Sequence, residues 1–444
     1  MTKSITTNLQ LMEMLNDLAS ENTIYFSYNS EILDFTDKSK LDAYKLTIMA
    51  KKGIYELPLN SEWMMRLFFK ASRETIFRKD VKVLTWNIKN FISFCLSKFK
   101  LRFYFDCSII DLKILESFLG IKCEKPSKFS ECLNRLRSIF DSGKWNELQR
   151  IYKIVYLPLM LDVIPDMESI GILTDKKVHA YYDIAGQDNG RLLCHNAYQK
   201  GYVPHIITPD LKDQLKPLDF DQIFVYFDFK SMEVKVLQWL SQDYELQKVC
   251  ESDDIYKTVY ELITKTPCDT DDKRSLCKRF FLPVFYGMGA NALSENIGLP
   301  PEAAQAIVER IKKIFSTAYG WIESCQNKAK EQKYICDIFG KKRIFMDKEY
   351  KARNFVVQSP AAIFCLEKLI SLHKSLNGIA RIAYNVHDGY MIFSTRENLK
   401  KAILESQSVL LSKSDLFPDL RLDISCYAGR KLTELKKINL KKKE

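Results

Sequence analysis

The sequence has no uninterrupted apolar run long enough to cross a bilayer, so we expect no membrane-spanning helix and no membrane partner. It also has no internal repeat and no long low-complexity segment, which argues against a repeat architecture. Its twelve cysteines form no C-x-x-C pair or other metal-ligand spacing, and this predicts a reducing compartment and no structural zinc. The first residues do not resemble a signal peptide. We therefore expect an intracellular, cytoplasmic protein.

The chain has enough residues and enough apolar character to form two or three domains. It contains 444 residues, of which 46% are hydrophobic, so each domain can bury a core. The formal net charge of +11 favours a polyanionic partner such as nucleic acid, although many basic proteins bind none. Charge alone therefore leaves the function open.

Two aspartates stand at the ends of expected strands. Residues 223–229 are apolar and aromatic, as in a buried strand, with Asp228 at or near the end. A second apolar strand, residues 382–386, leads to a turn that contains Asp388, and residues 390–393 form a third. Magnesium prefers oxygen ligands and usually takes one or two protein carboxylates, with water and substrate phosphates as further ligands. Two aspartates on adjacent strands would therefore suit two-metal nucleotidyl transfer.

Residues 271–287 form an expected helix that carries cations and ends in aromatic residues. Arg274 and Lys278 are four residues apart, so they share one face and can bind a triphosphate together. Tyr286 follows two turns later and would face a base or sugar. Pro283 predicts that the helix is interrupted or kinked near its end.

These motifs, in this order, resemble those of the DNA polymerases of family A, which include bacterial polymerase I and related phage replicases. Residues 228–235 resemble the first palm motif of that family, D-Y-S-Q-I-E-L-R. Residues 274–288 resemble its fingers motif, R-x3-K-x7-Y-G-M, with the spacing intact. Residues 386–388 resemble the second palm motif, which is usually V-H-D-E. The resemblance covers roughly residues 150–435.

The resemblance implies roles for the matched residues. Asp228 and Asp388 would be catalytic ligands of two Mg²⁺ ions, and Lys278 would act as the acid near the departing pyrophosphate. Glu233 occupies the steric-gate position, which favours deoxynucleotides. The resemblance assigns the nucleotide site to Arg274, Lys278, Tyr286, Glu233, Tyr256 and Leu282. It assigns primer-template DNA contacts to Arg191, Asn354, Gln358 and His387.

Several positions depart from the family pattern. Gly389 replaces the glutamate that usually follows the second palm motif, so a third carboxylate is missing and we expect reduced metal chemistry. Leu282 and Pro283 stand where an aromatic residue and a glycine are common, which predicts altered sugar discrimination and closing of the fingers.

The amino-terminal residues 1–125 resemble a proofreading 3'-5' exonuclease domain that has lost its acids. Residues 23–29 match the position of its F-D-T-E strand, but Ser27 and Asn29 replace the acidic ligands, and Asp106 alone remains from a later acidic position. Two-metal hydrolysis needs those ligands, so we expect an exonuclease-like domain without nuclease activity. An unrelated α/β domain is the alternative.

The thumb of the family, a helical insertion that grips the duplex, has no room in this sequence. Its flanking elements nearly touch, because Gly171 to Asp175 runs directly into Lys177 and Val178. We expect residues 126–175 to form a helical connector with a vestigial thumb, and an accessory partner to supply the missing grip. Residues 176–444 would form palm and fingers, with the fingers at about 245–335.

The sequence thus predicts an α/β protein: a right-hand polymerase core, with an α+β palm and helical fingers, preceded by an exonuclease-like α/β domain. The expected activity is template-directed DNA synthesis from dNTPs on a primer. A noncatalytic primer-template binding or assembly subunit that has kept the polymerase shape is the alternative. RNA synthesis is disfavoured by Glu233.

Overall fold

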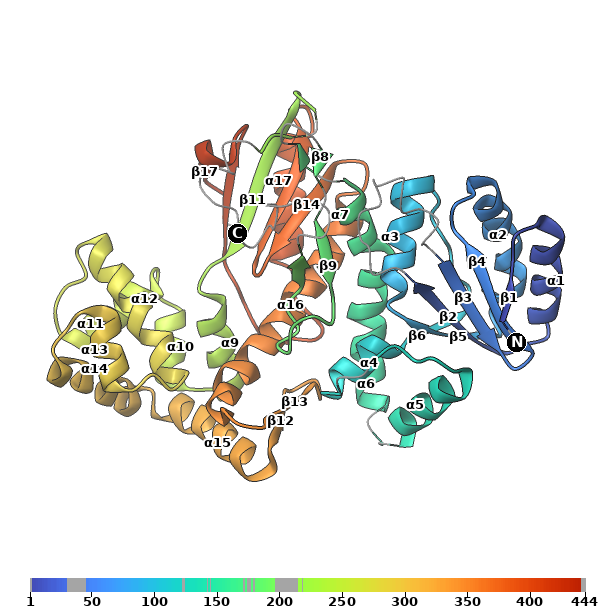
Figure 1. Ribbon diagram of the computed structural model, residues 1–444. Coiled ribbons are helices and arrows are strands. Elements are labelled where there is room, and N and C mark those ends of the chain that lie inside the picture. The colour runs from blue at the N-terminus through green and yellow to red at the C-terminus, as the bar shows by residue number, and fades with distance from the viewer. Residues whose placement is uncertain are drawn as a thin grey trace.

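The computed structural model contains two large sheets, one in each half of the chain, and a separate group of helices (Figure 1). It describes residues 2–29, 45–121, 124–141, 143, 145–170, 172–173, 177–178, 180–195, 215–217 and 219–440. Helices and strands both contribute to the cores, so the predicted α/β class is confirmed.

The amino-terminal half is built on a six-stranded mixed sheet in the order β1-β4-β3-β2-β5-β6. Strands β2, β3 and β4 pair antiparallel, whereas β5 runs parallel to β2 and β6 parallel to β5. Helix α3 packs on β2, while α1 and α2 pack together. The elements of this half are β1 (Thr2–Ser4), α1 (Asn8–Leu18), β2 (Thr23–Asn29), β3 (Lys45–Ala50), β4 (Gly53–Pro58), α2 (Glu62–Thr75), β5 (Lys82–Trp86), α3 (Ile88–Phe99), β6 (Ser108–Asp111), α4 (Leu112–Phe118) and α5 (Phe129–Asp141).

A run of helical segments and short strands connects the two large sheets. Strands β7 and β8 pair antiparallel directly after this helical run, and β9 pairs with β10. The predicted thumb boundary at Gly171 and residues 174–176 lies outside the described residues, so it stays a prediction. The connecting elements are α6 (Trp145–Ile151), the π-helical η2 (Tyr152–Tyr156) and η3 (Leu159–Val163), α7 (Ile164–Ile170), β7 (Ile172–Leu173), β8 (Lys177–Val178), β9 (Tyr181–Asp183) and β10 (Leu193–His195).

The second sheet has five strands in the order β14-β15-β11-β16-β17, and all its neighbours pair antiparallel. The long helix α16 passes beneath it in Figure 1 and contacts β14. Tyr390 of β15 donates a hydrogen bond to the Cys365 carbonyl of this helix at 2.8 Å, which ties the sheet to the helix. The elements are β11 (Gln222–Phe229), α9 (Met232–Ser241), α16 (Ala352–Ser375), β14 (Ala380–Val386), β15 (Gly389–Thr395), α17 (Leu399–Leu410), β16 (Ile424–Gly429), the 3-10 helix η6 (Leu432–Glu434) and β17 (Lys436–Ile438).

A group of helices from α10 to α15 extends away from the five-stranded sheet (Figure 1). Asp243 is buried and fixes two of these helices, because its carboxylate accepts hydrogen bonds from the amides of Leu246 and Ala318 at 2.8 and 2.9 Å. The elements are α10 (Tyr244–Cys250), α11 (Ile255–Thr264), α12 (Asp271–Phe285), α13 (Ala290–Ile297), α14 (Pro301–Ile314), α15 (Ser316–Gln332), β12 (Tyr334–Cys336), β13 (Lys342–Ile344) and the 3-10 helix η5 (Glu349–Lys351).

Two helices differ from what the sequence predicts. Helix α12 is not interrupted at Pro283 but continues to Phe285, although the proline cannot donate a backbone hydrogen bond to the preceding turn. Residues 349–375 form a helix that is long and apolar enough to cross a membrane, but 83% of its apolar window is buried inside the protein. Its apolar surface is therefore accounted for by core packing.

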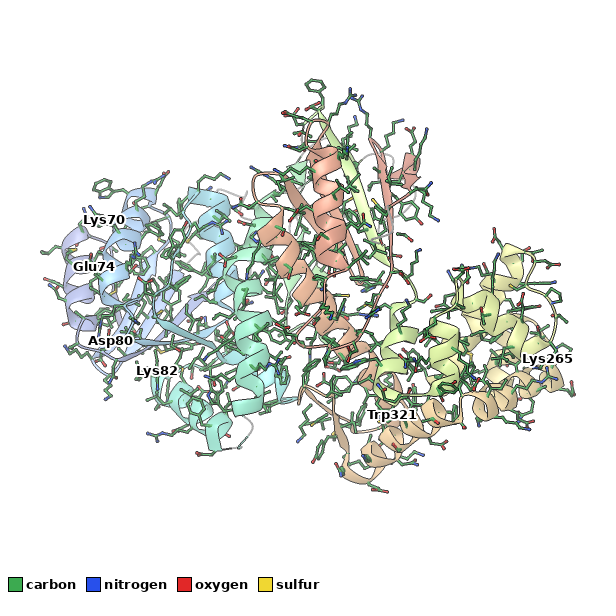
Figure 2. The ribbon with its side chains drawn as sticks, turned by 180° about the vertical axis from the view of Figure 1, so that it is seen from behind. Lys70, Glu74, Asp80, Lys82, Lys265 and Trp321 are labelled. Carbon is green, nitrogen blue, oxygen red and sulfur yellow. The ribbon has the colours of Figure 1, made fainter. Side chains whose placement is uncertain are left out.

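Exposed charged side chains lie at both ends of the molecule when it is viewed from behind (Figure 2). Lys70, Glu74, Asp80 and Lys82 lie on the amino-terminal half, whereas Lys265 lies at the far end of the helical group. Both signs of charge are present on the amino-terminal surface seen in this view. That surface is therefore not a purely cationic patch of the kind that binds nucleic acid by charge alone.

A buried ion pair joins the two halves. Lys89 of α3 donates to Glu168 of α7 at 2.7 Å, and each side chain is 1% exposed. The same carboxylate accepts from the Tyr182 amide at 2.8 Å, and the Lys89 ammonium lies 3.7 Å from the centroid of the Tyr181 ring. Burial lowers the pKa of Lys89 and raises that of Glu168, so each charge depends on the other.

We expect Lys89→Met to lower the free energy of unfolding by about 3 to 5 kcal/mol, because it leaves the Glu168 charge buried without its cation. Arg66→Met is the control, since Arg66 forms an exposed ion pair with Glu62 and should change stability by less than about 1 kcal/mol. Urea denaturation followed by circular dichroism measures both. Equal effects of the two substitutions would contradict this account of the junction.

Candidate active site

Asp228 and Asp388 come together because of the antiparallel pairing in the five-stranded sheet. Asp228 lies near the end of β11, as predicted, and its partner across β15 is Gly389. Asp388 lies in the two-residue turn between β14 and β15, and its carbonyl accepts a hydrogen bond from the Phe229 amide at 3.4 Å. The predicted pair of strands around Asp388 is therefore confirmed.

The turn that carries Asp388 is held by a side chain that the sequence did not single out. Asn385 is buried, and its amide nitrogen donates to the carbonyls of Gly389 at 2.9 Å and His387 at 3.3 Å. His387 has a φ of 54°, which is uncommon for a residue with a side chain. The only signal for Asn385 was an amide within an otherwise apolar strand.

The two carboxylates interact electrostatically. Partial burial and, to a smaller extent, the negative charge of Asp388 raise the pKa of Asp228 to about 6. Hydrogen bonding by Tyr226 and the positive charge of Lys278 act in the opposite direction. The pKa of Asp388 is also raised, chiefly by burial, while Arg191 opposes the rise. The site therefore gathers negative charge in partly desolvated surroundings, where a divalent cation would be stabilised.

The donor set fits magnesium. Two carboxylates on neighbouring strands are the oxygen ligands that Mg²⁺ takes from proteins, and open positions remain for water and substrate. Within the part of the chain that the structure describes, no group of three or more His, Cys, Asp or Glu side chains could hold a metal ion. The predicted ions would be held by the pair Asp228 and Asp388, with water and substrate as further ligands.

Helix α12 presents two cations toward one aromatic ring. The Arg274 guanidinium lies 5.5 Å, and the Lys278 ammonium 5.2 Å, from the centroid of the Tyr256 ring. Arg274 also donates to Asp254 at 2.7 Å, and Asp254 is the N-cap of α11. Leu282 lies one turn beyond Lys278 and is half-buried. The three predicted nucleotide-binding residues Arg274, Lys278 and Tyr256 therefore form one cluster.

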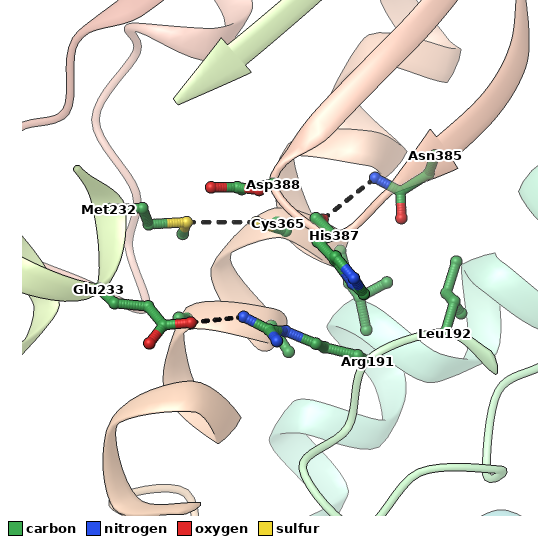
Figure 3. A pocket seen from close by; sticks show the side chains of 11 residues that line it. Arg191, Leu192, Met232, Glu233, Cys365, Asn385, His387 and Asp388 are labelled. Atoms are coloured by element: carbon green, nitrogen blue, oxygen red, sulfur yellow. Dashed lines mark hydrogen bonds and ion pairs between the residues drawn. The ribbon is translucent and has the colours of Figure 1, made fainter. Parts of the chain in front are cut away.

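A second cluster forms around the carboxylate of Glu233. Arg191 donates to it at 2.6 Å, Gln358 donates at 3.3 Å, and the hydroxyl of Tyr286 donates to its other oxygen. Figure 3 shows Arg191 and Glu233 facing each other in the pocket that also contains His387 and Asp388. Partial burial and the charge of Arg191 lower the pKa of His387.

The predicted DNA-contacting residues are only partly brought together. Arg191 and His387 line the pocket beside Asp388. Gln358 does not line the pocket, but it donates a hydrogen bond to Glu233, which does. Asn189 was not predicted, yet its amide donates to Gln358 at 3.4 Å. Asn354 lies one turn before Gln358 on α16 and is not among the residues that line the pocket.

The expected loss of acids in the amino-terminal half can be followed on its sheet. Ser27 is buried on β2, and the side chain of Asn29 lies outside the described residues. Asp106 is exposed and lies 3.5 Å from Arg73. Asp111, which no motif in the sequence singled out, is fully buried and accepts hydrogen bonds from the amides of Ile88 and Ile114. Burial raises the pKa of Asp111 to about 6, and the residue acts as a helix cap.

The raised pKa of Asp228 predicts that its charge destabilises the metal-free protein at neutral pH. The native state binds this proton more tightly than the unfolded chain, where the pKa is near 3.8, so stability falls as pH rises from about 3.8 to about 6 and levels off above that. We expect Asp228→Asn to raise the free energy of unfolding by about 1 to 2 kcal/mol at neutral pH without divalent metal, and to have no such effect near pH 4.

Chemical denaturation in chelator at the two pH values measures this difference. Asp347→Asn is the control, because Asp347 is exposed and its substitution should change stability by less than about 0.5 kcal/mol. An Asp228→Asn protein that is no more stable than the control at neutral pH would contradict the electrostatic description of the site.

Comparison with known proteins identifies relatives of the carboxyl-terminal part. Residues 144–434 match the model of DNA polymerase family A. The thermostable DNA polymerase I of Thermus aquaticus is 26% identical over 217 residues, which cover 46% of this chain and 26% of that protein. DNA polymerase I of Chloroflexus aurantiacus is 22% identical over 283 residues, which cover 60% of this chain and 29% of that protein. The chain thus spans less than a third of the length of these relatives.

A solved structure resembles nearly the whole chain. The POL domain of Pol1 from M. smegmatis, in complex with DNA primer-template and dNTP, has a TM-score of 0.75 and 13% sequence identity. The similarity covers 97% of this chain and 99% of that chain, so it includes the amino-terminal sheet, and at this identity it establishes the fold. The family model, in addition, matches more than half of the sequence and contains both aspartates, both cations of α12 and the Glu233 cluster. The chain therefore belongs to DNA polymerase family A.

Proposed function

We propose that the chain is a DNA-directed DNA polymerase that transfers deoxynucleotides to a primer 3'-hydroxyl with the help of two Mg²⁺ ions. The observation that carries this proposal is the convergence of Asp228, Asp388 and Lys278, whose charges act on one another across three separate segments. Family membership supports it, as does the likeness to a fold that binds primer-template and dNTP in M. smegmatis Pol1.

In this proposal each segment contributes one task. Asp228 and Asp388 would hold the metal ions, which would supply activation of the attacking hydroxyl and stabilisation of charge on the phosphates. The charge of Lys278 lowers the pKa of Asp228, so the two groups interact, and we assign Lys278 the proton that the pyrophosphate takes on leaving. Arg274 would bind the phosphates, because a guanidinium forms paired hydrogen bonds with them.

The incoming nucleotide would lie between α12 and the Glu233 cluster. Tyr256 supports both cations of α12 and would hold them in place for the triphosphate. Leu282 and Tyr286 would flank the base, and Glu233 would contact the sugar. Because Glu233 accepts hydrogen bonds from Arg191, Tyr286 and Gln358, its carboxylate is held in a fixed position. A fixed side chain can exclude a 2'-hydroxyl better than a mobile one.

The primer-template would approach the same pocket from the side of α16. Arg191 and His387 line the pocket beside Asp388, Gln358 donates to Glu233 of the same pocket, and Asn354 lies one turn before Gln358 on the helix. Cationic and amide side chains at such a position bind the backbone and minor groove of DNA. The net charge of +11 supports association with a polyanion.

The domain boundaries also belong to the proposal: an exonuclease-like domain without nuclease activity at 1–125, a connector at 126–175, and palm and fingers at 176–444. Only residues 171–180 separate α7 from β9, which supports the absence of a long helical thumb. We infer low processivity, and an accessory protein that supplies the missing grip. Product length in primer extension with excess trap DNA measures this property.

Primer extension tests the activity. We expect the intact chain to extend a labelled primer on a DNA template with Mg²⁺ and dNTPs, and Asp228→Asn or Asp388→Asn to slow synthesis at least about 1000-fold, because each removes a metal ligand. Asp347→Asn, which changes an exposed acid elsewhere, should retain full activity. A chain that binds primer-template but never extends it would favour the noncatalytic binding subunit.

Sugar selection tests the role of Glu233 separately. We expect Glu233→Ala to raise ribonucleotide incorporation relative to deoxynucleotide incorporation at least about tenfold, since the side chain that excludes the 2'-hydroxyl is removed. Competition between the two nucleotide types on one template gives the ratio. Glu245→Ala is the control, because Glu245 is exposed on α10 and pairs with Lys248. An unchanged ratio would show that Glu233 does not select the sugar.

A further inference from the structure

Tyr226 lies beside the metal-binding pair, in space that would otherwise be available to residue 389. Tyr226 and Asp228 are two residues apart on β11, so their side chains share one face of the sheet. The Tyr226 hydroxyl donates to Asp228 Oδ1 at 3.3 Å. On the neighbouring strand, Asp228 pairs with Gly389.

A glycine is needed at position 389 because the Tyr226 ring leaves no room for a side chain, and not because of the backbone conformation there. Gly389 does not have the positive φ that favours glycine, so other residues could adopt its conformation. A Cβ atom there, however, would lie 2.2 Å from the Tyr226 hydroxyl oxygen and 2.7 Å from its Cζ. Tyr226 and any side chain at 389 therefore exclude each other unless the ring moves.

The ring is held on its other side as well. Tyr427 of β16 pairs with Tyr226 across the sheet, and the two ring centroids are 6.4 Å apart. The phenol thus lies between Tyr427 and the Cα of Gly389, with its hydroxyl directed at Asp228. A side chain confined in this way can orient the carboxylate that it contacts.

We propose that Tyr226 is a positioning residue for the metal site, and that its phenol replaces the acidic side chain that the family pattern has at 389. This inference rests on the proposed polymerase function. The phenol donates a hydrogen bond to Asp228 Oδ1. This bond fixes the orientation of the carboxylate and leaves its other oxygen free to bind a cation. A glutamate would instead add a third negative charge beside two carboxylates that already repel each other.

Mn²⁺ binding, followed by electron paramagnetic resonance without nucleotide, tests the proposal independently of catalysis. We expect Tyr226→Phe to weaken Mn²⁺ binding about tenfold, because the carboxylate loses its hydrogen-bond donor. Tyr427→Phe removes a hydroxyl from the adjacent ring and should leave the affinity within about twofold. Unchanged or tighter Mn²⁺ binding by Tyr226→Phe would overturn the proposal.

Substitution of the glycine provides the reciprocal test. We expect Gly389→Ala to displace the phenol and to weaken Mn²⁺ binding as Tyr226→Phe does. The double variant Tyr226→Ser with Gly389→Glu makes room for a carboxylate, so it should fold and bind Mn²⁺ at least as tightly as the intact chain. Gly389→Ala that binds Mn²⁺ like the intact chain would show that the contact is unimportant.

Kinetics distinguish positioning from a general effect on the fold. Tyr226→Phe should lower kcat about tenfold while the KM for dNTP changes less than about threefold, since the proposed nucleotide contacts are made by α12 and the Glu233 cluster and not by Tyr226. A change confined to KM, or a lowered melting temperature that accounts for the loss, would contradict a positioning role. If the intact chain makes no DNA, the proposed function fails, while the Mn²⁺ titrations still decide the role of Tyr226.

Discussion

The repulsion between Asp228 and Asp388 is the constraint on which the arrangement of the palm depends. The negative charge of Asp388 raises the pKa of Asp228, and two such carboxylates stay together only if the surrounding structure holds them. The sheet does so, because β11 is paired on both sides and the β14–β15 turn is held by Asn385. Lys278 and Arg191 supply positive charge from two other segments. The pairing of the sheet thus holds together two carboxylates whose proximity is unfavourable when no metal is bound.

A second electrostatic arrangement joins the amino-terminal half to this core. Lys89 and Asn90 are adjacent residues of α3 in the amino-terminal half, and both are buried. Lys89 pairs with Glu168, and Asn90 accepts a hydrogen bond from Tyr181 at 2.8 Å. Side chains of α3 therefore stabilise the junction between the amino-terminal half and the connector.

Much of the site could be predicted from the sequence because it depends on local patterns. The strand that ends near Asp228, the turn at Asp388 and the shared face of Arg274 and Lys278 follow from apolar runs and helical spacing. Pro283 was expected to interrupt or kink α12, but the helix continues through it to Phe285, although a proline cannot donate the backbone hydrogen bond that another residue would make there. Local sequence patterns thus predict the presence of a helix or strand more reliably than they predict where it ends.

The remaining features depend on contacts between distant segments. In the sequence, Tyr226 is one of several aromatic residues in a predicted buried strand, and nothing distinguishes it from the others. Its contact with Gly389 follows from the register of β11 and β15. The convergence of Arg191, Tyr286 and Gln358 on Glu233 joins four segments that are far apart in the chain. No spacing rule within one segment predicts such contacts. The sequence therefore predicted these residues individually, but it did not predict that they contact one another.

The most direct test of the account is a crystal structure of the chain with primer-template, a nonhydrolysable dNTP analogue and Mn²⁺, in which anomalous scattering locates the metal. The account predicts manganese bonded to the carboxylates of both Asp228 and Asp388, with the triphosphate between the metal and α12. Primer-template bound beside α16 with no manganese at either aspartate would contradict it, and would identify the palm as a binding surface without polymerase chemistry.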